Sequence, residues 1–191
     1  MLHIPEQGSN TSCIVGIDPG SENLGIAVLE FDLTILCITK TTAKTIVGSK
    51  LMKKNSWAIE LHGERASRIE ALQEAILDVL NQNNPIIVVC ESPFFSSRMP
   101  SAFGVLVEVM LAIKQAVSKF SVWKLVHFID PPTVKRGVGG KGNADKFKMK
   151  ELVCNLSDLC YHGNIAIADL DEHSIDAIAV AYTRFKELTS N

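Results

Sequence analysis

The stretch GIDPGSENLGIAV, residues Gly16–Val28, places one acidic side chain between two apolar runs. Asp18 follows a run with β-branched residues, and Pro19-Gly20 marks a turn before the second run. The pattern predicts a strand over 13–17, a tight turn and an antiparallel strand over 25–31. Two chemistries fit such a turn. It could be a glycine loop that cradles a nucleotide phosphate, or it could hold a carboxylate at a strand tip that binds a metal ion.

A nucleotide loop is the weaker alternative because the residues that contact phosphate are missing. A P-loop requires GxxxxGK[ST]; Gly20 and Gly25 have the spacing, but Ile26 and Ala27 stand where Lys and Ser/Thr are needed. Actin-like and sugar-kinase ATPases open with a similar strand, turn and strand. Those proteins close two copies of their fold around the nucleotide, and 191 residues have room for one. Asp18 is therefore interpreted as a metal ligand, provided that other carboxylates converge on it.

Length and composition predict one domain, 13–191, preceded by a flexible polar N-terminal arm, 1–12. Hydrophobic residues make up 47% of the chain, which is enough for a sizeable core. No apolar run reaches the ~20 residues of a membrane span, and the first twelve residues lack the regions of a signal peptide. We therefore expect a cytoplasmic protein, or one in an equivalent non-secreted compartment such as an organelle matrix.

The cysteine spacings are typical of reduced thiols. The five cysteines are Cys13, Cys37, Cys90, Cys154 and Cys160. An odd number without paired spacing argues against a disulfide framework, and the first three fall in predicted strands, where buried thiols are expected. Cys154, Cys160 and His162 lack the spacing and the second ligand pair of a zinc finger, so a metal site there is disfavoured.

The charge distribution indicates a polyanionic partner although the formal net charge is −2. From Lys114 to Lys150 there are nine Lys or Arg residues against two acids, and Lys40–Lys54 holds five lysines and no acid. The rest of the chain is acidic. One basic run alone is usually a solvated surface, but two such runs on an otherwise acidic chain favour nucleic acid as a partner.

Apolar periodicity along the chain predicts an α/β fold. A third strand is expected over 35–41, antiparallel to the second, and a polar, basic loop over 44–55. The remaining elements are predicted as helices over 56–81, 101–120, 133–136, 143–156 and 169–188, and strands over 86–90 and 122–129. Asp169 and Glu172 fit a capping box at the last helix. The order predicts a mixed five-stranded sheet, with three antiparallel and two parallel strands and helices on both faces.

Two further carboxylates and a histidine are placed to join Asp18. Glu91 directly follows the buried run IIVVC, and sites form at strand ends in the middle of α/β sheets. His173 and Asp176 are three residues apart on the last helix and share one face. The apolar run Ala177–Ala181 must pack on the sheet and so brings Asp176 toward it. The acids before His173 are explained by the dipole of the helix instead.

Four motifs in this order resemble the RuvC-type Holliday junction resolvases, dimeric nucleases of the ribonuclease H-like superfamily. They are GIDPGxxxxG from Gly16, an acid after a buried strand, VKRGVGGKGNADK from Val134 and HSIDAIAVAY from His173. The resemblance covers about Cys13–Leu188. It implies a ribonuclease H-like fold and a nuclease that acts on branched DNA.

The resemblance implies an active site that holds two Mg²⁺ or Mn²⁺ ions. Its residues would be Asp18, Glu91, His173 and Asp176. Many family members have Asp where His173 stands, so this chain carries one negative charge fewer there, which would alter metal affinity or the route of proton transfer. Three carboxylates in one place repel one another unless cations lie between them. One ion would activate a water and the other would stabilise the leaving 3′ oxygen.

DNA contacts are also implied by the resemblance. Lys135 and Lys146 match positions that contact phosphates near the scissile bond, and Phe94 matches an aromatic residue that stacks on or wedges bases at the junction centre. Arg136 and Lys141 extend the basic cluster around a glycine-rich loop, whose backbone can approach a phosphate closely.

The apolar helix 101–120 matches the helix at the two-fold interface of the family, and a C2 dimer presents two equivalent sites to a four-way junction. The implied function is resolution of Holliday junctions by paired symmetric nicks in DNA recombination and repair. Two alternatives stay open. The chain could cleave mainly other branched DNA, such as flaps, forks or replication intermediates, or it could bind junctions without cleaving them.

Overall fold

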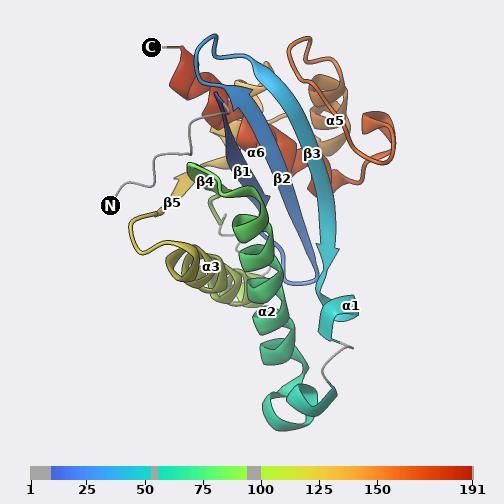
Figure 1. Cartoon of the computed structure of the whole chain (residues 1–191). Helices are drawn as coiled ribbons and strands as arrows, with labels where there is room; N and C mark the ends of the chain where they lie inside the picture. The colour runs from blue at the N-terminus through green and yellow to red at the C-terminus, as the bar shows by residue number, and fades with distance from the viewer. Residues whose placement is uncertain (1–9, 53–55, 94–99, 191) are drawn as a thin grey trace.

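A mixed five-stranded sheet between two layers of helices forms the computed structural model, which describes residues 10–52, 56–93 and 100–190 (Figure 1). The strands are β1 (Thr11–Asp18), β2 (Asn23–Asp32), β3 (Ile38–Val47), β4 (Ile87–Glu91) and β5 (Val126–Ile129). Their order across the sheet is β3-β2-β1-β4-β5. The first three strands pair antiparallel, β4 runs parallel to β1, and β5 runs parallel to β4, as the sequence predicted.

Helices cover both faces of this sheet. They are α1 (Gly48–Met52), α2 (Ser56–Asn83), α3 (Pro100–Phe120), α4 (Pro131–Gly137), α5 (Lys146–Cys154) and α6 (Glu172–Thr189), with a short 3₁₀ turn, η1 (Ile167–Asp169), before the last. Figure 1 shows α2 and α3 on one side of the sheet and α6 on the other. Each side has its own core of buried apolar side chains.

The central strand β1 supplies both cores, because successive side chains of a strand point to opposite faces. Ile14 belongs to the core under α6, whereas Val15 and Ile17 belong to the core under α2 and α3. All three are fully buried. Burial on both faces explains why this strand has a continuous apolar run in place of an alternating one.

Two glycines allow α6 to lie unusually close to the sheet. A Cβ atom on Gly16 would stand 2.5 Å from the carbonyl oxygen of Ala177, and one on Gly25 would stand 2.0 Å from that of His173. Any larger residue at either position would push the helix away from β1 and β2. The glycines of the opening stretch therefore serve packing, and a phosphate loop is not needed to explain them.

Two predicted elements of the sheet were wrong in their bounds. β3 extends through Val47, so the predicted loop over 44–55 begins as strand and continues as α1. β3 lies at the edge of the sheet, and its many polar side chains weaken the apolar signal. At the other edge the predicted strand over 122–129 begins only at Val126, as β5. The apolar residues Val122, Trp123 and Leu125, which suggested a longer strand, are exposed in the preceding connection.

Smaller differences concern caps and helix limits. The last helix begins at Glu172 and is capped by Asp171, whose side chain accepts a hydrogen bond from the Ser174 N–H, so the predicted capping box at Asp169 was wrong. Helix α2 contains a non-helical residue, Gly63, with φ 79° and ψ 162°. Cys37 was predicted to be buried in a strand but is exposed just before β3.

Candidate active site

The tips of two adjacent parallel strands bring the first two predicted residues together. Ile17 of β1 stands opposite Cys90 of β4 in the sheet register, so Asp18 and Glu91 follow side by side at the same edge. Asp18 is buried, with 9% of its surface exposed, and Glu91 is partly buried. This edge is the carboxyl end of the parallel strands, where sites form in open α/β sheets.

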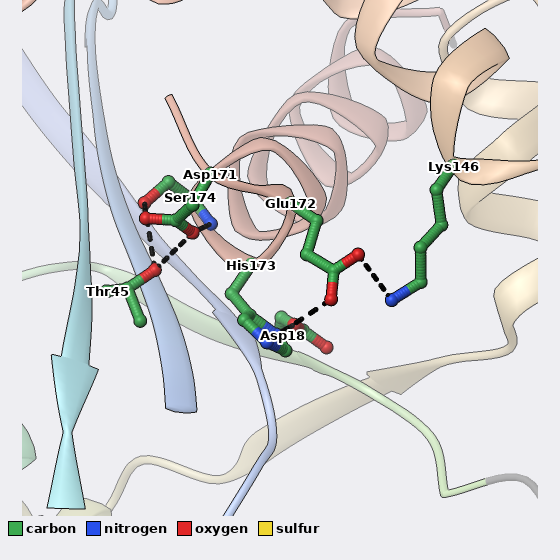
Figure 2. A network of polar contacts seen from close by, with 7 residues as sticks. All are labelled: Asp18, Thr45, Lys146, Asp171, Glu172, His173 and Ser174. Carbon is green, nitrogen blue, oxygen red and sulfur yellow. Dashed lines mark hydrogen bonds and ion pairs between the residues drawn. The ribbon is translucent and has the colours of Figure 1, made fainter. Parts of the chain in front are cut away.

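Helix α6 brings the other two predicted residues to this edge. The Nδ1 atom of His173 lies 2.8 Å from Oδ2 of Asp18, and since a carboxylate can only accept, the imidazole donates this hydrogen bond. Asp176, one turn further along, is partly buried below it. Residues 155 positions apart in the chain are thus joined in one polar contact (Figure 2).

Hydrogen bonds from a residue of β3 hold the start of α6 in place. The hydroxyl of Thr45 donates to Oδ1 of Asp171, the capping residue, and lies 3.1 Å from the hydroxyl of Ser174 (Figure 2). Asp171 in turn accepts from the backbone N–H of Ser174. Because the capping residue is held by the sheet, the first turn of α6 and its His173 are held with it.

The carboxylates of the site destabilise each other's charged forms. Burial, together with the charges of Asp18 and Asp176, raises the pKa of Glu91 to about 8. Burial and the charge of Asp18 raise the pKa of Asp176 to about 6. Both groups therefore lie in a region that is poor in water and rich in negative charge, which favours a bound cation or a proton.

His173 balances part of this negative charge. Its hydrogen bond to Asp18 raises the pKa of the imidazole, and burial opposes the shift without reversing it. A histidine in this place is protonated more readily than a free one near neutral pH. As it lies, His173 acts as the hydrogen-bond partner of Asp18 through Nδ1, and the Nε2 atom faces Glu172 at 3.6 Å.

The side chains of the site are of the chemical types that bind divalent cations. Magnesium and manganese prefer carboxylate oxygens, which Asp18, Glu91 and Asp176 supply, whereas imidazole is a more usual ligand for zinc, copper, iron and nickel. Within the described ranges, however, no group of three or more Asp, Glu, His or Cys side chains is arranged to hold a metal ion. Burial and the charge of Asp18 raise the pKa of both Glu91 and Asp176, and this is the observation that fits a cation. To become ligands together, these side chains must rotate toward one another.

Two of the predicted DNA-contacting lysines face this site. The charge of Lys135, on α4, lowers the pKa of Glu91, and the charge of Lys146, at the start of α5, lowers that of Asp176. Lys146 forms an ion pair with Glu172, with 2.6 Å between Nζ and Oε2 (Figure 2). The site is therefore bordered by two cations on the side of α4 and α5.

The other predicted DNA contacts have different surroundings. Arg136 donates to the hydroxyl of Thr133, in its own helix, and Lys141 is exposed in the glycine-rich loop. That loop turns back onto α4, since the N–H of Gly140 donates to the carbonyl of Lys135, 2.9 Å away. Phe94 lies outside the described residues.

Three contributions to the site escaped the sequence-based prediction. Thr45 was assigned to a loop, Glu172 was explained by the helix dipole, and Gly25 was predicted as the first residue of a strand without a role in packing. Gly25 had a usable signal, since a glycine inside a strand often marks a close backbone approach. Thr45 and Glu172 had none, because their partners Asp171 and Lys146 reach them only through the packing of separate elements.

A five-stranded mixed sheet in this order, with acids at the tips of β1 and β4 and on the helix that packs across them, is the architecture of ribonuclease H-like proteins. Residues 14–184 match the family model described as "Crossover junction endodeoxyribonuclease RuvC". The chain belongs to this family.

Curated relatives carry the same description. The protein from Carboxydothermus hydrogenoformans is 28% identical over 92% of this chain and 96% of its own length. The protein from Wigglesworthia glossinidia brevipalpis is 28% identical over 90% of this chain and 92% of its own. Both are described as crossover junction endodeoxyribonuclease RuvC, so the similarity extends over nearly the whole of each protein.

Solved structures confirm the fold. Thermus thermophilus RuvC in complex with a Holliday junction substrate superposes with a TM-score of 0.63 at 20% identity, over 93% of this chain and 96% of that one. The yeast mitochondrial Holliday junction resolvase Ydc2 gives a TM-score of 0.63 at 10% identity, over 95% and 80%. Within the described ranges, no helix combines the length and the apolar character needed to cross a bilayer.

Proposed function

We propose that this chain is a structure-specific DNA endonuclease that resolves four-way junctions by paired symmetric nicks, in DNA recombination and repair. The observation that carries the proposal is the meeting of Asp18, Glu91 and the first turns of α6 at one sheet edge, in a chain of the RuvC family. Two lysines border this edge, as a phosphodiester substrate requires.

The site would hold two Mg²⁺ or Mn²⁺ ions between Asp18, Glu91, Asp176 and His173. When bound, such ions activate a water and stabilise the leaving 3′ oxygen. The carboxylates supply negative charge. The pKa of Glu91, about 8, means that this group must lose a proton before it can ligate at neutral pH, whereas Asp176, with a pKa of about 6, is mostly ionised there. His173 donates to Asp18 and carries a proton at the site, so it is suited to proton transfer as well as to ligation.

DNA would approach over the side formed by α4 and α5. Lys135 and Lys146 are assigned as phosphate contacts beside the carboxylates, because the charge of each lowers the pKa of one of them. Arg136 and Lys141 extend the basic surface outward along the glycine-rich loop, and Phe94 is assigned to base contacts at the junction centre. Contacts to phosphates position the DNA backbone without reading its sequence.

A homodimer through α3 would supply the second nick. One face of this helix packs on the sheet through Val109, Met110 and Ile113, which are buried. The opposite face is exposed and includes Val107 and Leu111, which show 47% and 55% of their surface. These two residues are four positions apart, so they form one apolar stripe that a second α3 can cover.

The test is a cleavage panel with mapped nick positions. A four-way junction, a flap, a fork and a linear duplex of equal length are incubated with Mg²⁺, with Asp18→Asn beside the wild-type protein. We expect symmetric nicks in opposite strands of the four-way junction, and no nicks from Asp18→Asn although it still binds the junction. Faster cleavage of flaps or forks would favour the related branched-DNA nuclease. Tight junction binding without nicks in Mg²⁺ or Mn²⁺ would point to a non-cleaving binding protein.

A further inference from the structure

Lys146 occupies a position where a cation is electrostatically unfavourable and an anion is favoured. It is the first residue of α5, and the positive end of a helix dipole attracts negative groups. The capping residue of α5, Asp145, places one carboxylate at this helix end, where it accepts a hydrogen bond from the Lys148 N–H, and the first turn itself contains no acid. The group that pairs with the ammonium of Lys146 comes from another helix, since Oε2 of Glu172 on α6 lies 2.6 Å from Nζ of Lys146 (Figure 2).

The carboxylate of Glu172 connects this lysine to the active site. Its Oε2 atom pairs with Lys146, and its Oε1 atom lies 3.6 Å from Nε2 of His173, whose Nδ1 atom is bonded to Asp18. The chain of contacts Lys146, Glu172, His173 and Asp18 runs from the basic border to the buried carboxylate (Figure 2). The pair therefore lies at the rim of the site and faces it.

Both partners remain accessible. The side chains of Lys146 and Glu172 are 67% and 46% exposed, so an incoming phosphate can reach the ammonium group. A phosphate next to Glu172 meets a like charge, however, and an ammonium shared with a carboxylate has less charge left to neutralise DNA. In the free protein Glu172 thus fills the place of an anionic ligand on Lys146.

We infer that Glu172 is a positioning residue that acts as an internal substitute for a DNA phosphate on Lys146, and that DNA must displace it to enter the site. The inference rests on the proposed function, since Lys146 contacts DNA only if the chain binds it. Displacement of one ion pair by another releases fewer counterions than a new contact does. Glu172 therefore weakens DNA binding and reduces its dependence on salt.

Glu172→Gln tests this inference, and Glu151→Gln is its matched control. Glu151 also pairs with a lysine of α5, Lys148, at 2.8 Å, and the two side chains are 51% and 48% exposed. Each substitution removes one negative charge and one exposed ion pair on or beside the same helix. Only Glu172 contacts both Lys146 and His173.

Binding of each protein to a labelled four-way junction is measured by fluorescence anisotropy in EDTA over a series of salt concentrations, so that metal binding and cleavage do not contribute. We expect Glu172→Gln to bind about two- to five-fold more tightly than wild type, with a log–log salt slope steeper by up to about 0.9. Glu151→Gln should differ from wild type by less than about two-fold.

A double-mutant cycle with Lys146→Gln separates the specific effect from a general change in charge. In the Lys146→Gln background, Glu172→Gln should change affinity and salt slope no more than Glu151→Gln does. Equal effects of Glu172→Gln and Glu151→Gln, or a gain that persists without Lys146, would overturn the inference. If the wild-type protein binds linear duplex as tightly as the four-way junction, the proposed function is contradicted. The comparison between the variants still tests the inference about Glu172 in that case.

Discussion

Helices α6 and α3 lie on opposite faces of one sheet and are both rich in apolar residues, yet they are buried to different degrees. The run Ala177–Ala181 of α6 is completely buried. α3 is the more apolar helix of the two, and still exposes about half of Val107 and Leu111. The difference arises because Gly16 and Gly25 let α6 approach the sheet, while α4 and α5 cover its other side.

The two helices therefore have different functions in the proposed enzyme. The run Ala177–Ala181 of α6 is buried on all sides, so the backbone of the helix is held in place and carries His173 and Asp176 to the sheet edge beside Asp18. α3 exposes Val107 and Leu111, and in the proposal this apolar stripe contacts a second copy of the chain. The expected outcomes below test this division, from the largest effect to the smallest.

Asp176→Asn should have the largest effect, on the α6 side. Without this carboxylate we expect single-turnover cleavage of a four-way junction in Mg²⁺ to fall at least about 10³-fold, since metal coordination is worth several kcal/mol to the transition state. Junction binding in EDTA should be retained. Asp169→Asn is the control, because Asp169 is exposed on η1 and should leave the rate within about two-fold of wild type. Normal cleavage by Asp176→Asn would contradict the proposed site.

Gly16→Ala should have the next largest effect, on stability, because its new methyl group meets the backbone of α6. We expect the free energy of unfolding to fall by about 3 kcal/mol, measured by urea denaturation. Gly104→Ala is the matched change on α3, where a Cβ atom meets none of the described atoms within 4 Å. Replacing a helical glycine there should raise stability by about 0.5–1 kcal/mol. Similar losses in both variants would remove the distinction between the two helices.

Leu111→Glu tests the proposed interface on α3. Introducing a charge into an apolar interface should weaken dimerisation by about 10- to 100-fold, which sedimentation equilibrium can measure. Leu61→Glu is the control, because Leu61 is 71% exposed on α2 and lies outside the proposed interface. A monomer-to-dimer equilibrium that does not respond to Leu111→Glu would exclude this face as the contact.

The pH dependence of stability should be the smallest effect and should come from the α6 side. The pKa values of Glu91 and Asp176 in the folded state are about 8 and about 6, above those of an unfolded chain. Between the unfolded and folded values the native state binds more protons, so its stability falls as pH rises. We expect the Tm in EDTA to decrease by several degrees from pH 5 to pH 8.

Glu91→Gln should flatten this decrease, because the neutral amide does not titrate. Added Mg²⁺ should restore the Tm at pH 8 more than at pH 5, where protons compete with the ion. If the decrease in Tm is unchanged in Glu91→Gln, the titration of Glu91 does not cause it.

Much of the fold could be predicted because strands and helices have local periodicity. The apolar runs before Asp18 and Glu91 identified both strands and placed both acids at strand ends. The prediction was wrong where local pattern and environment disagree. β3 is a polar edge strand that was read in part as a loop, and the apolar residues Val122 and Trp123 lie in an exposed connection.

The sequence by itself predicted which residues would carry the chemistry, because Asp18, Glu91, His173 and Asp176 stand in motifs that resemble those of the RuvC-type resolvases. Only the tertiary structure decided how they are held. The hydrogen bond from Thr45 to Asp171 spans 126 positions, and the ion pair of Lys146 with Glu172 joins two helices. Such contacts depend on how separate elements stack on the sheet, and this stacking leaves no periodic signal in either segment alone.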